Sequence, residues 1–130
     1  MTTDTPAATT MHIGELADKT GLSLRTIRHY DEVGLLKPSG RTDGGFRLYT
    51  QEDLSRLMLI RRMKPLGFSL EEMTELLRII GVLKSGNAGT DNDDVRARLA
   101  SFIEQAEERQ RTLERQLDMA NEFVELLRSQ

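Results

Sequence analysis

One segment limits the fold of this chain more than any other: residues 94–129 contain neither Pro nor Gly. Such a segment predicts a single helix, roughly 54 Å long at about 1.5 Å per residue. Two rows of residues recur along it with a spacing of seven. The first row is apolar throughout and consists of Leu99, Ala106, Leu113, Ala120 and Leu127. The second row is mostly apolar and consists of Arg96, Ile103, Gln110, Leu117 and Val124. Paired heptad rows indicate a coiled coil.

A helix of this length cannot bury its apolar stripe alone, so it needs a partner. The partner could be a second copy or the chain's own N-terminal part. A second copy is favoured, because the apolar residues outside the rows lie mainly near the ends of the helix (Val95, Phe102, Phe123). We expect antiparallel pairing, in which Val95 and Phe102 help to seat one N-terminal domain at each end. The predicted dimer interface is Leu99, Ile103, Ala106, Gln110, Leu113, Leu117, Ala120, Val124 and Leu127.

The pattern before this helix predicts a helix-turn-helix. Apolar residues at helical spacing cover 12–20 and end at Gly21, a residue that favours helix termination. Ser23 is a suitable N-cap for a second helix that runs to about Val33, and Gly34 ends it. Two short helices joined by a tight turn that contains Gly have the helix-turn-helix geometry.

A turn-rich stretch, 39–45, leads into Phe46-Arg47-Leu48-Tyr49, where apolar and polar side chains alternate. This predicts a small β-hairpin, which after a helix-turn-helix is a wing. Two further helices follow, one starting at Thr50 and one between Ser69 and Gly81. The predicted organisation is a polar disordered tail (1–10), a winged helix-turn-helix head (11–81), a linker loop (82–93) and a coiled-coil dimerisation helix (94–129). The fold class is mainly α.

The net charge of −3 conceals an uneven distribution. Residues 1–70 hold ten Lys and Arg against eight Asp and Glu, whereas 71–130 hold eight against thirteen. A polyanion should therefore meet the first half. The chain has no Cys and only two His, so we expect no thiolate metal site, no metal and no cofactor. The N-terminus lacks a signal peptide and no run approaches a membrane span, so we expect a soluble, cytoplasmic protein; translation could start at Met1 or Met11.

Donors for base edges and phosphates cluster on the second helix and the wing. Arginine can hold guanine or phosphate with two parallel hydrogen bonds, His29 can face a base edge, and the Tyr30 hydroxyl can reach a phosphate. Tyr30 could equally be half-buried core. The predicted DNA-binding residues are Ser23, Arg25, Arg28, His29, Tyr30, Arg41, Phe46, Arg47 and Lys64. No converging set of groups suggests catalysis, so we expect no enzyme and no catalytic residue.

Three motifs resemble the DNA-binding domain of the MerR family: TIRHYDEVGLL in the second helix, GGFRLYT in the wing and LGFSLEEM at the fourth helix. With the long terminal helix, the resemblance covers nearly the whole chain after Thr10. It implies a bacterial transcription regulator that binds double-stranded promoter DNA as a homodimer. The two copies would be joined by an antiparallel coiled coil. It also implies distortion of an over-long promoter spacer, so that RNA polymerase is affected through the promoter. The DNA-contacting positions above match the family's motif positions.

The chain departs from the family pattern at three positions. His29 stands where a second aromatic is common, Phe46 replaces a common wing Tyr, and Pro65 has no amide to donate. No sensor is evident. An effector could bind a small pocket between head and coiled coil, a protein partner could act instead, or binding could be constitutive. The alternative function is an architectural or recombination-accessory DNA-binding protein, but such proteins usually lack the long coiled coil.

Overall fold

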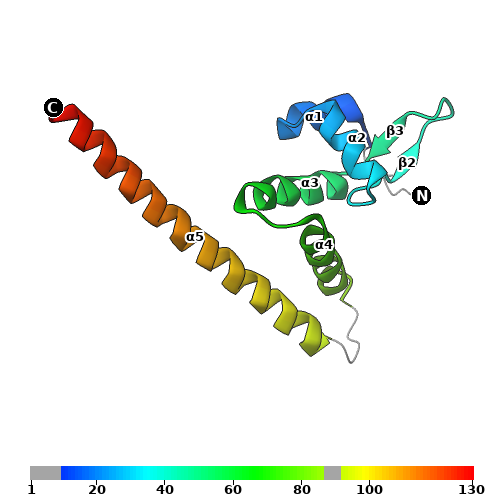
Figure 1. Ribbon diagram of the computed structural model, residues 1–130. Coiled ribbons are helices and arrows are strands. Elements are labelled where there is room, and N and C mark those ends of the chain that lie inside the picture. Colours follow the sequence, from blue (N-terminus) through cyan, green and yellow to red (C-terminus); the bar gives the residue numbers. More distant parts are fainter. Residues whose placement is uncertain (1–9, 87–91) are drawn as a thin grey trace. The chain divides into compact units, whose positions relative to one another are not determined.

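The computed structural model describes residues 10–86 and 92–130, and within them a mainly helical chain with one small sheet (Figure 1). The elements in order are β1 (Met11–His12), α1 (Ile13–Thr20), α2 (Leu24–Glu32), β2 (Gly40–Arg41), β3 (Arg47–Tyr49), α3 (Gln51–Met63), the 3-10 helix η1 (Lys64–Leu66), α4 (Leu70–Lys84) and α5 (Asn92–Arg128). The chain forms two compact units, residues 1–74 and 75–130, with the division inside α4. The predicted tail and the middle of the predicted linker lie outside the described residues.

The predicted helix-turn-helix is confirmed in α1 and α2. Gly21 adopts φ +73°, and its N–H donates to the Ala17 carbonyl, which ends α1 in a left-handed cap. Helix α1 packs against both α2 and α3. Leu16, Ile27 and Leu57, one from each helix, are fully buried. This shared core holds α2 in a fixed orientation and leaves its other face to solvent.

The wing belongs to a three-stranded antiparallel sheet of order β1-β3-β2. Strand β2 pairs with β3 so that Arg41 lies opposite Arg47, as expected for a hairpin. Strand β1 was not predicted: Met11 pairs with Tyr49, and His12 with Leu48. Two residues show no periodicity, so their pairing depends on the tertiary fold. The extra strand anchors the base of the wing to the start of α1.

Helix α3 starts after Thr50, as predicted, and its first turn carries a capping box. The Thr50 hydroxyl accepts from the Asp53 amide at 3.2 Å, and the Asp53 carboxylate accepts from the Thr50 amide at 2.9 Å. The same exchange opens α4, between Ser69 and Glu72 at 2.8 and 3.1 Å. Each box satisfies backbone donors that helix starts leave free. The two helices therefore begin where the sequence predicted.

The prediction that Gly81 ends the fourth helix is wrong, because α4 continues to Lys84. A glycine inside a helix costs only about 1 kcal/mol relative to alanine, and the partly buried Val82 and Leu83 follow it. The first residues of the predicted linker, 82–84, are therefore helical. Helix α5 begins at Asn92, two residues before the predicted start, and spans 37 residues.

Along α5 the apolar side chains of the C-terminal half are open to solvent in the single chain. Leu113 is 47% exposed, Leu117 60% and Val124 41%. Near the start of α5, Val95 differs: it is 4% exposed, so its own chain already covers it. The expectation that Val95 helps to seat a head at this end of the helix stays a prediction. Across the described residues, no helix combines the length and the hydropathy that a membrane crossing requires.

Candidate nucleic-acid interface

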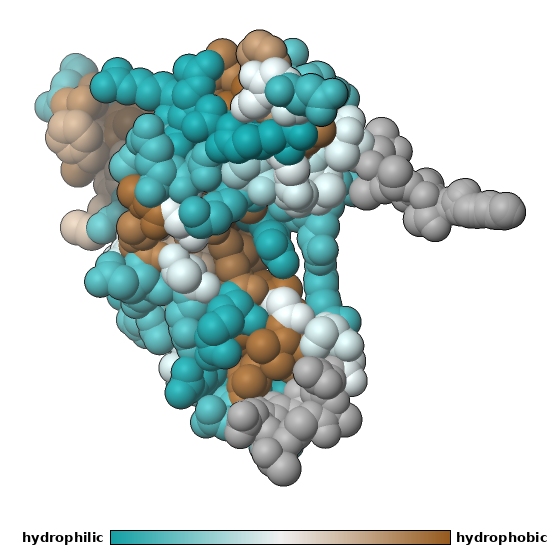
Figure 2. Space-filling model, turned by 90° about the vertical axis from the view of Figure 1, so that its right-hand side faces the viewer, coloured by the Kyte–Doolittle hydropathy of each residue, from teal (hydrophilic) through white to brown (hydrophobic). Residues whose placement is uncertain are grey.

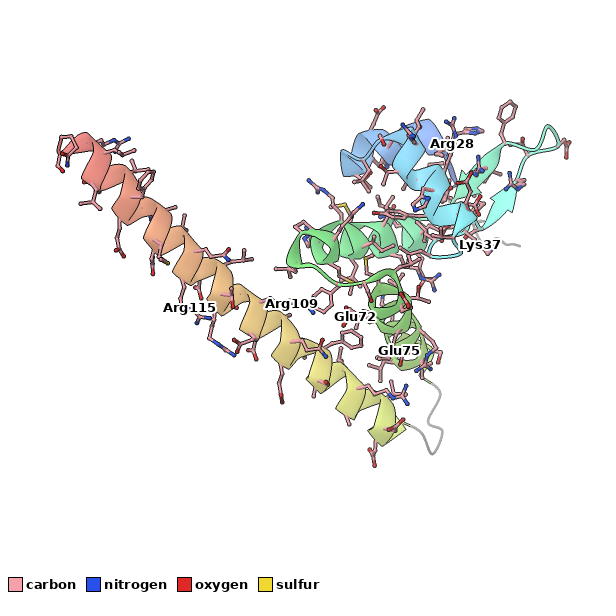
Figure 3. The ribbon with its side chains drawn as sticks, in the orientation of Figure 1. Arg28, Lys37, Glu72, Glu75, Arg109 and Arg115 are labelled. Carbon is pink, nitrogen blue, oxygen red and sulfur yellow. The ribbon has the colours of Figure 1, made fainter. Side chains whose placement is uncertain are left out.

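Helix α2 has a buried face and an open face. Ile27 is fully buried and Tyr30 is 3% exposed, whereas Arg25, Arg28 and His29 are exposed (Figure 3 labels Arg28). The predicted face with its positive and polar side chains is therefore available to a ligand. Figure 2 views the molecule from the side on which Figure 1 draws the wing, and hydrophilic residues predominate there.

Ser23 holds the start of α2. Its Oγ accepts from the Thr26 amide at 3.0 Å and lies 2.8 Å from the Thr26 hydroxyl. The side chain is exposed, yet both of these polar contacts are internal. Its first role in the structure is as N-cap, which fixes where the recognition surface begins.

Tyr30 belongs to the core. At 3% exposure its ring packs in the core, while the predicted contact of its hydroxyl with a phosphate stays a prediction. Its carbonyl accepts from the Leu35 and Leu36 amides at 2.9 and 3.1 Å, which turns the chain out of α2. The ammonium of Lys64 lies 6.0 Å from the centre of the Tyr30 ring. This contact brings the exposed Lys64, from the end of α3, to the side of α2.

The wing tip presents an aromatic ring. Phe46 is 69% exposed, and its backbone is fixed by bonds from its amide to the Thr42 hydroxyl (3.1 Å) and from the Thr42 amide to its carbonyl (2.9 Å). Gly45 has φ +85°, a conformation that favours glycine. A Cβ on Gly44 would lie 3.3 Å from the Phe46 ring, so glycine there lets the ring lie close to the turn. The tight turn therefore holds an apolar ring in the open.

Both wing arginines contact the carboxylate of Asp31 on α2. Arg47 donates through Nε to Asp31 Oδ2 at 2.9 Å, and its side chain is 24% exposed. A guanidinium nitrogen of Arg41 lies 3.6 Å from the same oxygen, and another donates to the Gly45 carbonyl at 3.0 Å. The hydrogen bond to Asp31 raises the pKa of Arg47 above its ordinary value. Sequence reasoning placed both arginines on DNA and missed Asp31.

Further exposed cations lie on the head. Arg56, Arg61 and Arg62 of α3 are open to solvent, as is Lys37 after α2 (Figure 3). Arg62 folds back onto the Met58 carbonyl at 3.1 Å. The sequence signal for this group was the run Arg61-Arg62-Met63-Lys64, from which only Lys64 was selected. These residues are exposed cations that the predicted DNA-binding set did not include.

The second unit carries charge of both signs. Glu75 accepts from Arg78 at 2.9 Å and from Arg98 at 2.7 Å, which links α4 to α5. These hydrogen bonds, with that of Arg78 contributing most, lower the pKa of Glu75 to about 2.

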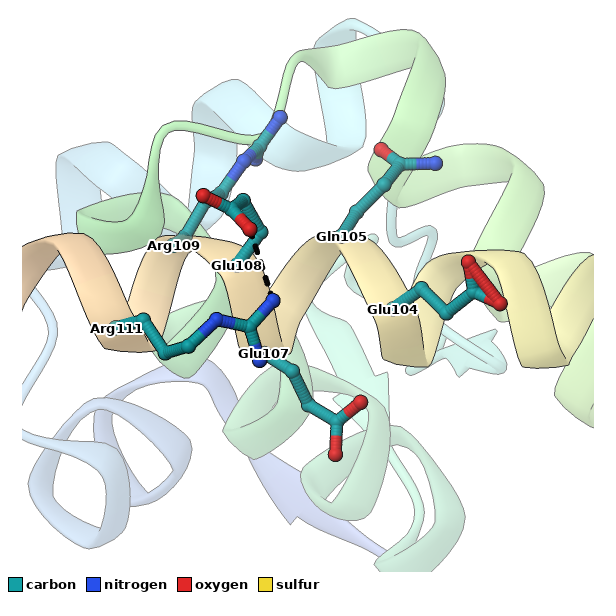
Figure 4. Close-up of a pocket in the computed structure, with 6 residues that line it drawn as sticks. All are labelled: Glu104, Gln105, Glu107, Glu108, Arg109 and Arg111. Carbon is teal, nitrogen blue, oxygen red and sulfur yellow. Dashed lines mark hydrogen bonds and ion pairs between the residues drawn. The ribbon is translucent and has the colours of Figure 1, made fainter.

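Farther along α5, Arg111 donates to Glu108 at 2.8 Å in a shallow hollow whose six lining side chains all belong to this one helix (Figure 4). Because one helix supplies all of its walls, this hollow is an open depression and not an enclosed binding pocket. In the part of the chain that is described, no group of His, Cys, Asp and Glu could hold a metal ion.

Comparison with protein families gives two matches. The model described as MerR HTH family regulatory protein matches residues 11–79, and the model described as MerR, DNA binding matches residues 54–120. The first covers the helix-turn-helix, the wing and most of α4. The second covers most of α3, all of α4 and much of α5.

Three proteins illustrate the similarity. An uncharacterised HTH-type transcriptional regulator from Pseudomonas aeruginosa is 36% identical over 115 residues, or 88% of this chain and 83% of that protein. The nodulation protein NolA of a Bradyrhizobium strain is 49% identical over 73 residues, 56% of this chain but only 31% of NolA, so the chain matches about a third of that relative's length. The fold is shared with HiNmlR, described as a MerR family regulator lacking the sensor domain, bound to promoter DNA. It gives a TM-score of 0.72 at 24% identity, over 93% of this chain and 92% of that one.

Proposed function

Because the chain belongs to the MerR family of DNA-binding transcription regulators, we propose that it binds promoter DNA as a homodimer and distorts an over-long promoter spacer. The observation that carries the proposal is the open face of α2. Arg25, Arg28 and His29 lie there beside a wing that the head holds in place. Arginine on a recognition helix discriminates bases through paired hydrogen bonds to guanine.

The homodimer is supported by α5. Its heptad rows remain open in the single chain, with Ile103, Leu113 and Leu117 between 47% and 60% exposed. Apolar rows of this length are stabilised when a second helix covers them. A symmetric dimer would carry two heads, so its binding site should be a two-fold inverted repeat.

The spacer mechanism rests on the family resemblance, and it has a direct test. In transcription with purified polymerase, the protein should activate a promoter whose spacer is longer than usual. Shortening that spacer by one or two base pairs should make the promoter active without the protein. If the shortened promoter still needs the protein, regulation does not depend on spacer length.

The experiment that tests DNA recognition is the binding of purified protein to fragmented host DNA, followed by footprinting of the strongest site. We expect a two-fold symmetric footprint inside a promoter. Arg28→Ala should weaken that binding by roughly tenfold or more, the effect of losing a good paired contact to a base. The matched control is Arg115→Ala, which removes the same charge from exposed α5 (Figure 3). Only weak, unspecific binding would favour the architectural alternative.

A further inference from the structure

One carboxylate joins the recognition helix to both wing strands. Asp31 lies in the last turn of α2, and its side chain is 13% exposed. Its Oδ2 lies 2.9 Å from Arg47 Nε, on β3, and 3.6 Å from a guanidinium nitrogen of Arg41, on β2. Arg41 and Arg47 are themselves opposite one another in the sheet. The two guanidinium groups therefore meet at a single oxygen.

The contact continues to the tip of the wing. Arg41 also donates to the Gly45 carbonyl at 3.0 Å, so Asp31 is connected through Arg41 to the residue that precedes Phe46. Strands β2 and β3 are only two and three residues long, and β2 has no second neighbour in the sheet. Short hairpins are only marginally stable without packing partners. A largely buried carboxylate with a charge-assisted hydrogen bond is a strong tether for such an element.

We propose that Asp31 is a positioning residue for DNA binding: it fixes the wing against α2 so that the two meet the DNA together. This rests on the proposed function. It also assigns Arg41 and Arg47 first to the tether, and leaves the wing's direct contacts chiefly to its tip.

For the loss of Asp31, the proposal and simple electrostatics predict opposite changes in affinity for the specific site. A negative charge near a DNA-binding surface repels phosphates, so its removal alone should strengthen binding to any DNA. If Asp31 positions the wing, its removal should instead weaken binding to the specific site. Binding to unspecific DNA, which needs no fixed wing, should stay the same or strengthen.

The test uses Asp31→Asn, which keeps the side chain's shape and removes its charge. The matched control is Asp18→Asn, the same charge change on an exposed side chain of α1, away from the wing. Both are measured in the full-length chain against the strongest site recovered from fragmented host DNA and against a mixed-sequence duplex of equal length. Asp31→Asn should lose about tenfold or more on the specific site, the scale of one charge-assisted hydrogen bond. Asp18→Asn should bind both duplexes at least as well as the unchanged protein.

Two further readouts separate positioning from general loss of stability. Hydroxyl-radical footprinting of Asp31→Asn should lose protection at the flanks, where we expect the wing to contact the DNA, and keep it at the centre of each half-site. Asp31→Glu retains the carboxylate and should recover most of the specific affinity. Should Asp31→Asn fail to fold, Arg41→Gln breaks only the outer part of the tether, at a side chain 49% exposed, and should accelerate amide hydrogen exchange at Thr42 and Gly45 in the absence of DNA.

A measurement without DNA distinguishes failure of this inference from failure of the proposed function. Amide hydrogen exchange should accelerate in Asp31→Asn at the wing amides of Thr42 and Gly45, with the core of α3 unchanged. Accelerated wing exchange with no specific site in the host DNA would refute the proposed function and retain the tether. Unchanged wing exchange, or specific binding as tight as that of the unchanged protein, would overturn the role of Asp31.

Discussion

Replacement of Leu117 by alanine should weaken the dimer strongly and leave the head intact. Leu117 occupies one of the two heptad rows of α5 and is 60% exposed in the single chain. Its neighbour in the other row, Leu113, is 47% exposed. In the proposed coiled coil both side chains become buried against a second copy. The free energy of that burial is absent from the single chain, so the substitution should act on association rather than on folding.

The size of the effect follows from the exposed fraction. Full burial of a leucine side chain contributes about 1.5–3 kcal/mol relative to full exposure. With three-fifths of Leu117 open, and part of the side chain kept in alanine, about 1 kcal/mol per chain is expected. A symmetric dimer loses this twice, so the dissociation constant should rise by roughly thirtyfold. Alanine is a better helix former than leucine, so helix propensity works against this loss.

Sedimentation equilibrium over a range of concentrations measures the dissociation constant directly. The matched control is Met119→Ala, an equally drastic truncation of a side chain that is 70% exposed but lies outside both rows. It should change association far less. If Met119→Ala dissociates the dimer and Leu117→Ala does not, the two copies meet through another face of α5. If neither has an effect, the interface is elsewhere in the chain.

Three further results are expected. Because Arg78 and Arg98 hold the pKa of Glu75 near 2, against an ordinary 4.5, the stability from this cluster is present above pH 4.5 and is lost as pH falls toward 2; acid unfolding of Glu75→Gln should lack that step, and identical acid profiles would contradict the assignment. Thr50→Ala removes the cap of α3 and should lower the free energy of unfolding by about 1 kcal/mol in thermal denaturation; an unchanged midpoint would mean that the box does not hold the helix start. Affinity for DNA should fall with salt, by about 0.9 in log K per log unit of salt for each neutralised phosphate; salt-insensitive binding would exclude phosphate contacts.

Local chemistry explains which parts of the fold could be predicted. The Ser23 cap and the boxes at Thr50 and Ser69 depend on residues within three positions, so the sequence contains everything that determines them. The glycine at 21 is similar. By contrast, strand β1 exists only because β3 lies beside it. The prediction that the helix ends at Gly81 was wrong because a glycine inside a helix costs little free energy, and the helix continues through it to Lys84.

The candidate site was predicted where helical spacing determines exposure. In α2, Ile27 points into the core, and helical spacing then determines which of its neighbours face solvent. Arg25, Arg28 and His29 are exposed, as expected. The same spacing puts Tyr30 three residues from Ile27, on the buried face. The pattern therefore places the Tyr30 ring in the core, and a contact of its hydroxyl with a phosphate stays a prediction.

In the wing, an arginine of the alternating segment faces inward and an apolar ring faces outward. Asp31 is the partner of that inward arginine. Apolar side chains of a strand normally face the core, yet Phe46 is 69% exposed while Tyr49 is fully buried, so Arg47 shares the inner face with Tyr49. An arginine there would be costly without a partner, and the Asp31 carboxylate at 2.9 Å supplies one. That partner is sixteen residues away along the chain, beyond what alternation within a strand can reveal. The ion pair thus offsets the cost of turning Arg47 inward, in a strand that Phe46 precedes with its ring exposed at the surface where DNA is proposed to lie.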